Sequence, residues 1–362
     1  MRTTWALLGL LCFAVAGTAA AQDFSADPYT DFDPLVHGLP DESAVPSRGI
    51  PSYTVPGDGC DGACQECAGD WTSTYAAVEL TFLKPYFSTN TAAIDNQTDD
   101  FSFASTNMVA FSSPMTLAPR VWIGRTLARG YGGRIGYWYL TETPADITLS
   151  PAGSGFGTVS SPILINNSDY VPTTSNPDDA FTASSELTVY TIDGEGTKYA
   201  QVGDWQLCAT GGLRYGSIAQ SYLANVTDSA GDVRSTASFG HHFIGVGPTL
   251  SLELIRPLNP CWAAFGRARG SVLFGNVKNR LTAVEDADLD SPFTTSQTNN
   301  QSGVVPIGEL RVGVERVVQT PYAEWFLRVA LEGQFWLNVG SAAQSTGDLG
   351  LFGFTTALGV SF

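Results

Sequence analysis

From Trp71 to the C-terminus the chain repeats stretches of about 12 to 18 residues in which apolar side chains alternate with small or polar ones. In the last stretch, Phe352, Phe354 and Leu358 share one face. Strands of globular sheets have about five or six residues, whereas tilted strands that cross a bilayer need about 9–11. The pattern therefore predicts an all-β fold, a transmembrane antiparallel up-and-down barrel. Its expected strands are 75–88, 115–127, 131–142, 185–199, 206–222, 239–256, 261–278, 304–318, 322–337 and 351–362.

The connections between these ten expected strands alternate between long and short. Outer-membrane barrels show the same asymmetry, with tight periplasmic turns and longer outer loops. A soluble β-sandwich, the alternative fold, gives no reason for this sorting. A barrel of 12 strands is a further alternative if 101–111 or 156–165 pairs as an additional strand. In order the connections span 89–114, 128–130, 143–184, 200–205, 223–238, 257–260, 279–303, 319–321 and 338–350.

The first 70 residues differ in composition from the rest of the chain and lack its alternation of apolar and polar side chains. Residues 1–21 read as a signal peptide, with Arg2 before an apolar core and Ala19-Ala20-Ala21 as the cleavage site. Residues 22–70 are rich in Pro, Asp and Gly and have no apolar periodicity, which predicts a disordered periplasmic linker. The expected domains are thus the signal peptide, the linker and an outer-membrane barrel over 71–362.

Five cysteines remain after cleavage, so at least one stays unpaired or joins a partner. Cys60, Cys64 and Cys67 lie in the linker and lack the fourth ligand of a tetrahedral metal set. They predict local disulfides or a cross-link to an envelope partner. Cys208 and Cys261 are expected on strands separated by one other, about 9–10 Å apart and too far for a direct bond. One of the two could join the linker cysteines instead.

The net charge and the hydropathy of the chain exclude several classes of protein. The 362 residues include 18 basic and 35 acidic side chains, a net charge of −17, and no basic run. This excludes nucleic-acid binding, which needs cationic contacts to phosphate. Mean hydropathy of +0.03 excludes a bundle of transmembrane helices, and a hydrophobic fraction of 43% argues against disorder of the whole chain.

Three sequence features resemble a known family. The first strand opens at Trp71 and continues Tyr75-Ala76-Ala77-Val78-Glu79-Leu80-Thr81-Phe82-Leu83-Lys84-Pro85 after a cysteine-containing linker. A middle strand reads Leu187-Thr188-Val189-Tyr190-Thr191-Ile192-Asp193-Gly194-Glu195, and the chain ends on an alternating strand with Phe362. The chain resembles the pore-forming outer-membrane proteins related to the Legionella major outer membrane protein, especially planctomycete members. The resemblance covers about 71–362. It implies a bacterial outer-membrane barrel with pore activity and no catalytic residue, and an assembly signal at Phe362 for the barrel-assembly machinery.

With the apolar face toward lipid, the opposite face places both signs of charge in the lumen. These residues can line a polar channel whose charges set ion selectivity, or they can form salt bridges that fill a narrow barrel. Ten strands lie between barrels filled by side chains and porins with an aqueous channel, so both interpretations stay open. The expected lumen residues are Glu79, Arg120, Arg134, Arg214, Glu253, Arg267, Arg269, Glu309, Arg311, Glu315, Glu324, Arg328 and Glu332.

The expected outer loops are acidic, most densely at Glu285, Asp286, Asp288 and Asp290. The spacing is similar to the start of a calcium loop but lacks its glycine and distal glutamate. We therefore expect a solvated acidic face that favours cations near the mouth. We expect no metal and no cofactor.

A barrel hydrolase would need a base beside paired carboxylates at the outer rim. His241 and His242 are expected at that rim, but no carboxylate pair is placed beside them, so we do not expect an enzyme. The expected function is passive diffusion of small solutes or ions through an outer-membrane pore in contact with membrane lipid. The alternative is a non-conducting structural or adhesive barrel that acts through its outer loops, chiefly 143–184; a hydrolase is the third reading.

Overall fold

The computed structural model describes residues 72–99, 103–152, 157–165, 169–285 and 293–362. All of them belong to one compact unit, Arg48–Phe362. The predicted signal peptide and the predicted linker with its cysteine cluster lie outside the described residues. Among those residues, no helix is long and apolar enough to span a membrane.

Ten antiparallel strands form a closed ring, which confirms the predicted barrel and its strand number. The first and last strands close it through a continuous register from Tyr75–Ser361 to Phe87–Leu349. Backbone bonds in both directions between Thr74 and Phe362, at 2.8 and 2.9 Å, extend this seam to the C-terminal residue. In ring order the strands are β1 (Ser73–Phe87), β4 (Thr116–Thr126), β5 (Tyr131–Glu142), β11 (Ala180–Val202), β12 (Trp205–Thr227), β13 (Val233–Pro257), β14 (Trp262–Glu285), β15 (Phe293–Gln319), β16 (Glu324–Trp336) and β17 (Leu349–Ser361).

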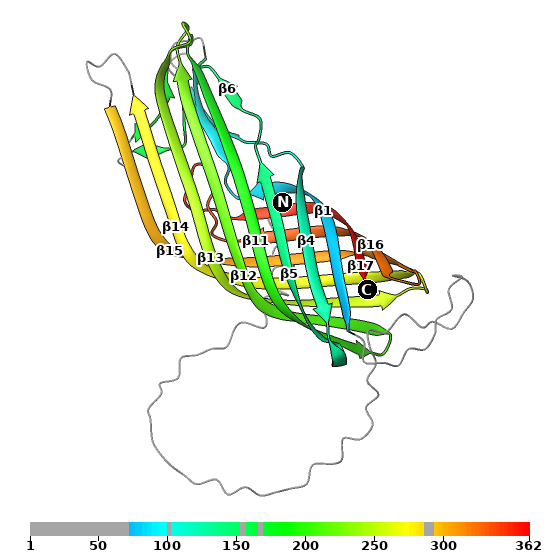
Figure 1. Ribbon diagram of the computed structural model, residues 1–362. Helices are drawn as coiled ribbons and strands as arrows, with labels where there is room; N and C mark the ends of the chain where they lie inside the picture. Colours follow the sequence, from blue (N-terminus) through cyan, green and yellow to red (C-terminus); the bar gives the residue numbers. More distant parts are fainter. Residues whose placement is uncertain (1–71, 100–102, 153–156, 166–168, 286–292) are drawn as a thin grey trace, which may run out of the picture. The chain divides into compact units, whose positions relative to one another are not determined.

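The ring is taller on one side than on the other (Figure 1). Strands β11 to β15 have 23 to 27 residues, whereas β1, β4, β5, β16 and β17 have 11 to 15. We call the part of β11–β15 that extends beyond the shorter strands the outer wall. The wall corrects two of the predicted loops: most of 223–238 and 279–303 is strand, because Thr, Ser, Asn and Gln there alternate too weakly to be recognised.

Segments that connect the ring strands along the chain form a small second sheet. Its order is β10–β7–β2–β3, with β2 at Thr91–Asp99, β3 at Phe103–Ala110, β7 at Thr158–Ser160 and β10 at Thr173–Thr174. Three short strands, β6 (Ile147–Leu149), β8 (Leu164–Ile165) and β9 (Asp169–Tyr170), and the 3-10 turn η1 (Ala128–Gly130) complete the elements. The alternative of 12 ring strands was wrong, because β3 and β7, which lie within those two stretches, belong to this second sheet instead.

The outside of the ring carries a band of exposed apolar side chains, among them Leu250 at 69% and Leu331 at 61% exposure. So many exposed large apolar residues are stable only against lipid. On β14 the outward residues Val272 and Phe274 lie in the band, whereas Asn276 and Lys278 above them are polar. The outer wall therefore rises above the membrane.

Candidate functional site in the barrel lumen

Fourteen charged side chains point into the lumen in the lower part of the ring, and we call them the ionic layer. They comprise seven arginines and seven acids, so their formal charges cancel. The strand register places each arginine opposite one acid on the neighbouring strand. The seven opposite pairs are Glu79 with Arg120, Glu195 with Arg134, Asp193 with Arg214, Glu253 with Arg267, Glu309 with Arg269, Glu332 with Arg311, and Glu315 with Arg328.

Many of these charges also pair across the lumen. Arg120 on β4 bonds Glu332 on β16 at 2.9 Å, and Arg311 on β15 bonds Glu79 on β1 at 2.9 Å. Two ring strands separate the partners in each case. Arg120 also keeps its neighbour Glu79 at 2.9 Å, and Arg311 keeps Glu332 at 3.1 Å. These four side chains thus tie four strands into one cluster.

A second cluster crosses the lumen between β11, β12, β14 and β15. Arg269 reaches Asp193 at 2.7 Å and Glu195 at 2.6 Å, across two intervening strands. Arg214 bonds Asp193 at 2.6 Å and also pairs with Glu309 on the far side. Each of these acids therefore accepts from at least one arginine that does not belong to a neighbouring strand.

The third cluster is centred on Arg328. Its guanidinium pairs with Glu315 on the next strand and with Glu253 at 3.2 Å across the lumen. It also lies over the rings of Phe265 and Phe326, with 4.9 and 5.2 Å to the ring centres. The planar cation is thus held by acids at its edge and by aromatic faces.

Little of the ionic layer reaches solvent. Among the ion-paired lumen residues, the side chain of Glu332 is 0% exposed, that of Arg214 is 3% exposed, and the largest value is 17% for Arg328. Charges this deep are tolerated only when they are paired and hydrogen-bonded. Indole and amide groups supply further donors, because Trp122 Nε1 donates to Glu79 at 2.8 Å and Gln334 Nε2 to Glu332 at 2.7 Å. In this conformation the ionic layer is packed rather than water-filled.

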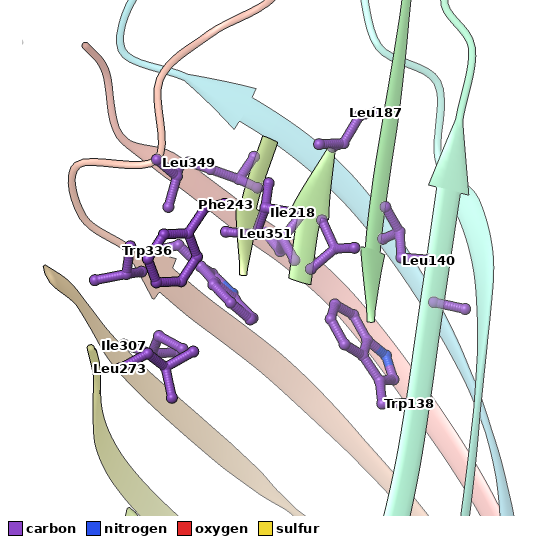
Figure 2. Packing of buried hydrophobic residues seen from close by; sticks show 14 of the residues in the cluster. Trp138, Leu140, Leu187, Ile218, Phe243, Leu273, Ile307, Trp336, Leu349 and Leu351 are labelled. Carbon is purple, nitrogen blue, oxygen red and sulfur yellow. The ribbon is translucent and has the colours of Figure 1, made fainter. Parts of the chain in front are cut away.

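A hydrophobic layer lies on the outer side of the ionic layer. On β16 the fully buried Trp336 follows Glu332, on β5 Trp138 and Leu140 follow Arg134, and on β14 Leu273 follows Arg269. Figure 2 shows these side chains converging from opposite walls. The rings of Trp138 and Trp336 stack at 6.3 Å. The layer comprises Leu83, Ala118, Trp138, Leu140, Leu187, Val189, Ile218, Phe243, Leu273, Val277, Val305, Ile307, Trp336, Val339, Leu349 and Leu351, each at most 6% exposed.

The connection between β16 and β17, residues 337–348, contributes to this packing, and we call it the inner segment. The backbone carbonyl of its Val339, which is fully buried, accepts a bond of 2.9 Å from Gln220 Nε2. Val339 and Gly340 donate to the carbonyl of Gly347, at 2.9 and 3.1 Å. The sequence predicted an outer loop at 338–350, but the inner segment packs against the lumen side of β12.

His241 is buried beside the inner segment. Its Nδ1 pairs with Asn279 Oδ1 at 2.7 Å, and its Nε2 is buried without a hydrogen-bond partner among the described residues. A Cβ at Gly340, whose φ is +75°, would lie 3.2 Å from the imidazole. This site lies above the lipid-facing band, and burial lowers the pKa of His241, with Asn279 opposing the shift and His242 adding to it.

The cap is a third layer, built from the second sheet and the inner face of the outer wall. Tyr222 on β12 donates to the carbonyl of Ala92 on β2 at 2.7 Å and meets the ring of Phe111 edge-on. Ala342 and Ala343 of the inner segment belong to the same buried cluster. The apolar residues of the cap include Ala92, Ala93, Phe111, Val159, Ile163, Ile165, Val171, Phe181, Ala183, Tyr222, Ala224, Val226, Ala237, Ala283, Ala342 and Ala343.

Of the thirteen predicted lumen residues, twelve lie in the ionic layer. Glu324 lies at the first position of β16, where Gln319 donates to it at 3.4 Å, and is no part of the clusters. Asp193 and Glu195 were missed. Every second residue of β11 faces the lumen, and Phe181, Val189 and both acids share this buried face. The pattern was hard to recognise because threonines and tyrosines on the strand weaken the alternation of apolar and polar side chains.

The remaining candidate residues from the sequence do not belong to the ionic layer. Glu285 ends β14, and Asp286, Asp288 and Asp290 lie outside the described residues. His242 faces outward and pairs with Ser217 Oγ at 3.2 Å. Within the described part of the chain, no group of three or more His, Cys, Asp or Glu side chains is arranged to hold a metal ion.

The two downstream cysteines do not pair with each other. Cys208 is a buried free thiol, whereas Cys261 is disulfide-bonded.

The closed ring, the apolar outer band and the polar lumen define a β-barrel protein of the outer membrane. A family model described as the Legionella pneumophila major outer membrane protein precursor matches residues 71–361. The chain belongs to this family, and its location is the bacterial outer membrane. No curated protein matches it.

Solved structures match this chain at low sequence identity. The outer membrane protease OmpT from Escherichia coli is 11% identical, with a TM-score of 0.40, over 80% of this chain and 96% of that chain. A FadL homologue from Pseudomonas aeruginosa is 10% identical, with a TM-score of 0.23, over 80% and 90%. The toluene transporter TodX from P. putida is 8% identical, with a TM-score of 0.24, over 81% and 90%.

Proposed function

We propose that this protein is a non-conducting outer-membrane barrel that acts through its outer wall and cap. The observation that carries the proposal is the filling of the lumen by two stacked layers, the ionic layer and the hydrophobic layer. A hydrated ion passing through would have to displace both. The geometry thus favours the alternative function named from the sequence, the non-conducting barrel, over the expected pore.

The cost of opening supports this choice. Removing one partner of a buried ion pair costs about 3–5 kcal/mol, and the cross-lumen contacts include several such pairs. The hydrophobic layer adds side chains such as Trp336 and Leu273, both fully buried. Spontaneous opening of both layers together would be rare at equilibrium.

The outer wall offers a feature through which such a barrel can act. On the β16 side of β15, the ladder ends at the bond from Leu337 N to the carbonyl of Pro306, and among the described residues no strand pairs with 293–305 there. Residues 294–305 carry no charge, although the protein has a net charge of −17. Natural edge strands are usually protected by charges, proline or a bulge, so this edge supports an interaction role outside the cell.

A gated pore for small solutes or ions is the second candidate, and the register of the ionic layer favours it. Arg269 pairs across the lumen with Asp193 and Glu195, yet it stands beside Glu309 on the neighbouring strand. Arg214 shows the reverse arrangement, since it stands beside Asp193 and reaches across to Glu309. An exchange from partners across the lumen to partners along the wall would leave these charges paired while clearing the centre.

Single-channel recording in planar bilayers tests the proposal with the full-length protein. We expect no conductance steps from the wild type. We expect steps from a variant with Trp138→Ala, Leu273→Ala, Trp336→Ala and Arg269→Ala, which removes bulk from both layers and also shows that the protein inserts. Heat-modifiable gel mobility checks that both proteins are folded. Regular steps from the folded wild type would refute the closed barrel and support the pore.

We also propose that the barrel is not an enzyme. His241 contacts Asn279 and His242 contacts Ser217, and no carboxylate of the described residues hydrogen-bonds to either histidine. A peptidase assay of the wild type and of the variants His241→Ala and His242→Ala tests this. Activity that disappears in either variant would contradict it.

A further inference from the structure

An apolar groove crosses the outside of the ring at the seam where the barrel closes. It has a volume of about 500 Å³, within the range of about 300–1,000 Å³ that small-molecule sites occupy. Its lining comes from β5, β4, β1, β17 and β16, the strands nearest the two chain ends. The side chains on its outward face belong to the lipid-facing band, so its occupant comes from the membrane.

The register explains the hollow. One row of paired residues runs across five strands as Ile135, Ile123, Ala76, Val360 and Trp325, and all of them line the groove. Ala76 lies at the centre of this row between larger neighbours, so the row is deepest there. Tyr137, Val121, Val78 and Leu358 form the adjacent row toward the outer side.

The periplasmic end of the groove carries a cation. Arg125 follows Ile123 on the same outward face of β4, one row closer to the short turn at 127–130. It is exposed and has no ion-pair partner among the described residues. Its neighbours in the register are Gly133 on β5 and Thr74 on β1, so no large side chain shields it.

Arg125 differs from three other cations at this boundary, each of which lies over an aromatic ring. Lys198 lies 3.6 Å over the ring of Tyr131, Arg256 lies 5.4 Å over Trp205, and Arg316 lies 5.7 Å over Trp262. Outward-facing aromatic rings with cations are typical of the membrane–water interface, which places Arg125 at headgroup depth. Within the described part of the chain, the guanidinium of Arg125 thus has no aromatic or acidic partner at the level where phosphate groups lie.

We propose that the groove binds an anionic phospholipid of the periplasmic leaflet, with an acyl chain over Ala76 and its phosphate on Arg125. Lipid tails are as apolar as the groove, so burial of the chain alone gives little selectivity. The headgroup must supply it, and guanidinium binds phosphate through charge-assisted, often bidentate, hydrogen bonds. The inference is independent of whether the lumen conducts.

Native mass spectrometry of the full-length protein in detergent, titrated with phosphatidylglycerol or phosphatidylcholine, tests the site. We expect the wild type to hold one phosphatidylglycerol in preference to phosphatidylcholine. Arg125→Gln should weaken phosphatidylglycerol binding roughly tenfold, the effect of losing a hydrogen bond to a charged group. It should weaken phosphatidylcholine binding less, because the choline cation already offsets the attraction between Arg125 and the phosphate. Ala76→Phe, which fills the hollow, should weaken the binding of both lipids.

Two matched controls lie on β15, which pairs with the lining strand β16 but contributes no residue to the groove. Arg316→Gln removes a boundary cation away from the groove, and Val314→Phe enlarges a lipid-facing residue that does not line it. Both should bind like the wild type, and heat-modifiable mobility should show that every variant is folded. Wild-type binding by folded Arg125→Gln or Ala76→Phe would overturn the proposal. An equal loss in Arg316→Gln would also overturn it, because charge at any point of the boundary would then suffice.

Discussion

The ionic layer and the hydrophobic layer fill the same lumen by different chemistry. In the ionic layer, Glu332 is fully buried because two arginines surround it. In the hydrophobic layer, Trp336, only four residues further along the same strand, is fully buried against Trp138 and other apolar side chains. Two inward positions of one strand, with only Gln334 between them on that face, thus reach the same burial through opposite means.

The difference between the two layers indicates that they have different structural roles. A slip of one residue in the register would turn the arginines and acids of the ionic layer toward lipid, which is costly. The same slip in the hydrophobic layer would exchange one apolar residue for another, such as Leu273 for Phe274. The ionic layer therefore specifies the pairing of the strands, and the hydrophobic layer seals the lumen.

The largest expected effect comes from removing an acid from the ionic layer. Glu332→Ala leaves Arg120 and Arg311 to share Glu79, so one buried positive charge is uncompensated, and we expect a loss of about 3–5 kcal/mol in the free energy of unfolding. Denaturant unfolding in lipid vesicles, followed by tryptophan fluorescence, measures it. Glu324→Gln, at the same face but outside the clusters, is the control and should cost little. Equal losses in the two variants would show that the clusters do not matter.

A cavity in the hydrophobic layer should follow closely. Leu273→Ala removes a fully buried side chain, and we expect a loss of about 2–5 kcal/mol. Leu250→Ala on the lipid-facing side is the matched control, because lipid can fill the space and the loss should be much smaller. The same unfolding measurement compares them. If the control lost as much, the lumen would not be the tightly packed region.

The inner segment should respond to pH through His241. Burial lowers the pKa of this histidine in the closed state, whereas a released, solvated imidazole titrates near 6.5. The released state therefore binds the extra proton, and closure loses stability as pH falls below about 6.5 but not above it. The protection factor of residues 337–348, the intrinsic exchange rate divided by the measured rate at each pH, should fall from pH 8 to pH 5 in the wild type. It should fall less in His241→Gln, and an equal fall in both proteins would exclude His241 as the cause.

The smallest effect is expected in the cap. Tyr222→Phe removes the bond to the carbonyl of Ala92 and keeps the ring, so we expect a loss of about 1 kcal/mol. Hydrogen exchange in β2 should rise while exchange in β5 stays constant. A rise that extends through both strands would mean that the cap and the ring are one cooperative unit.

The sequence was enough to predict the ring because lipid-facing positions exclude charge. A charged residue such as Arg120 or Glu332 therefore shows which alternate positions of its strand face the lumen. It fails in the hydrophobic layer, where inward and outward residues are both apolar, as in Val304 and Val305 or Phe335 and Trp336. The alternation disappears there, and the sequence does not distinguish a sealed lumen from an open one.

The outer wall and the inner segment could not be predicted for a different reason. Residues 294–303 are polar on both faces because the wall stands in water above the membrane, so they read as a loop. The inner segment is rich in small residues such as Gly340, Ala342 and Ala343, and its burial depends on the space left between distant strands. Neither the outer wall nor the inner segment can be recognised from the alternation of apolar and polar residues along the chain.

The equal numbers of arginines and acids in the ionic layer bear on how the barrel responds to an electric potential. The work done by a transmembrane voltage on a moving element is proportional to the net charge that it carries. Moved as a unit, seven cations and seven anions carry none, so voltage exerts no net force on the layer. A potential across the outer membrane would therefore leave the layer in place, and any opening would have to be triggered by a change in contacts.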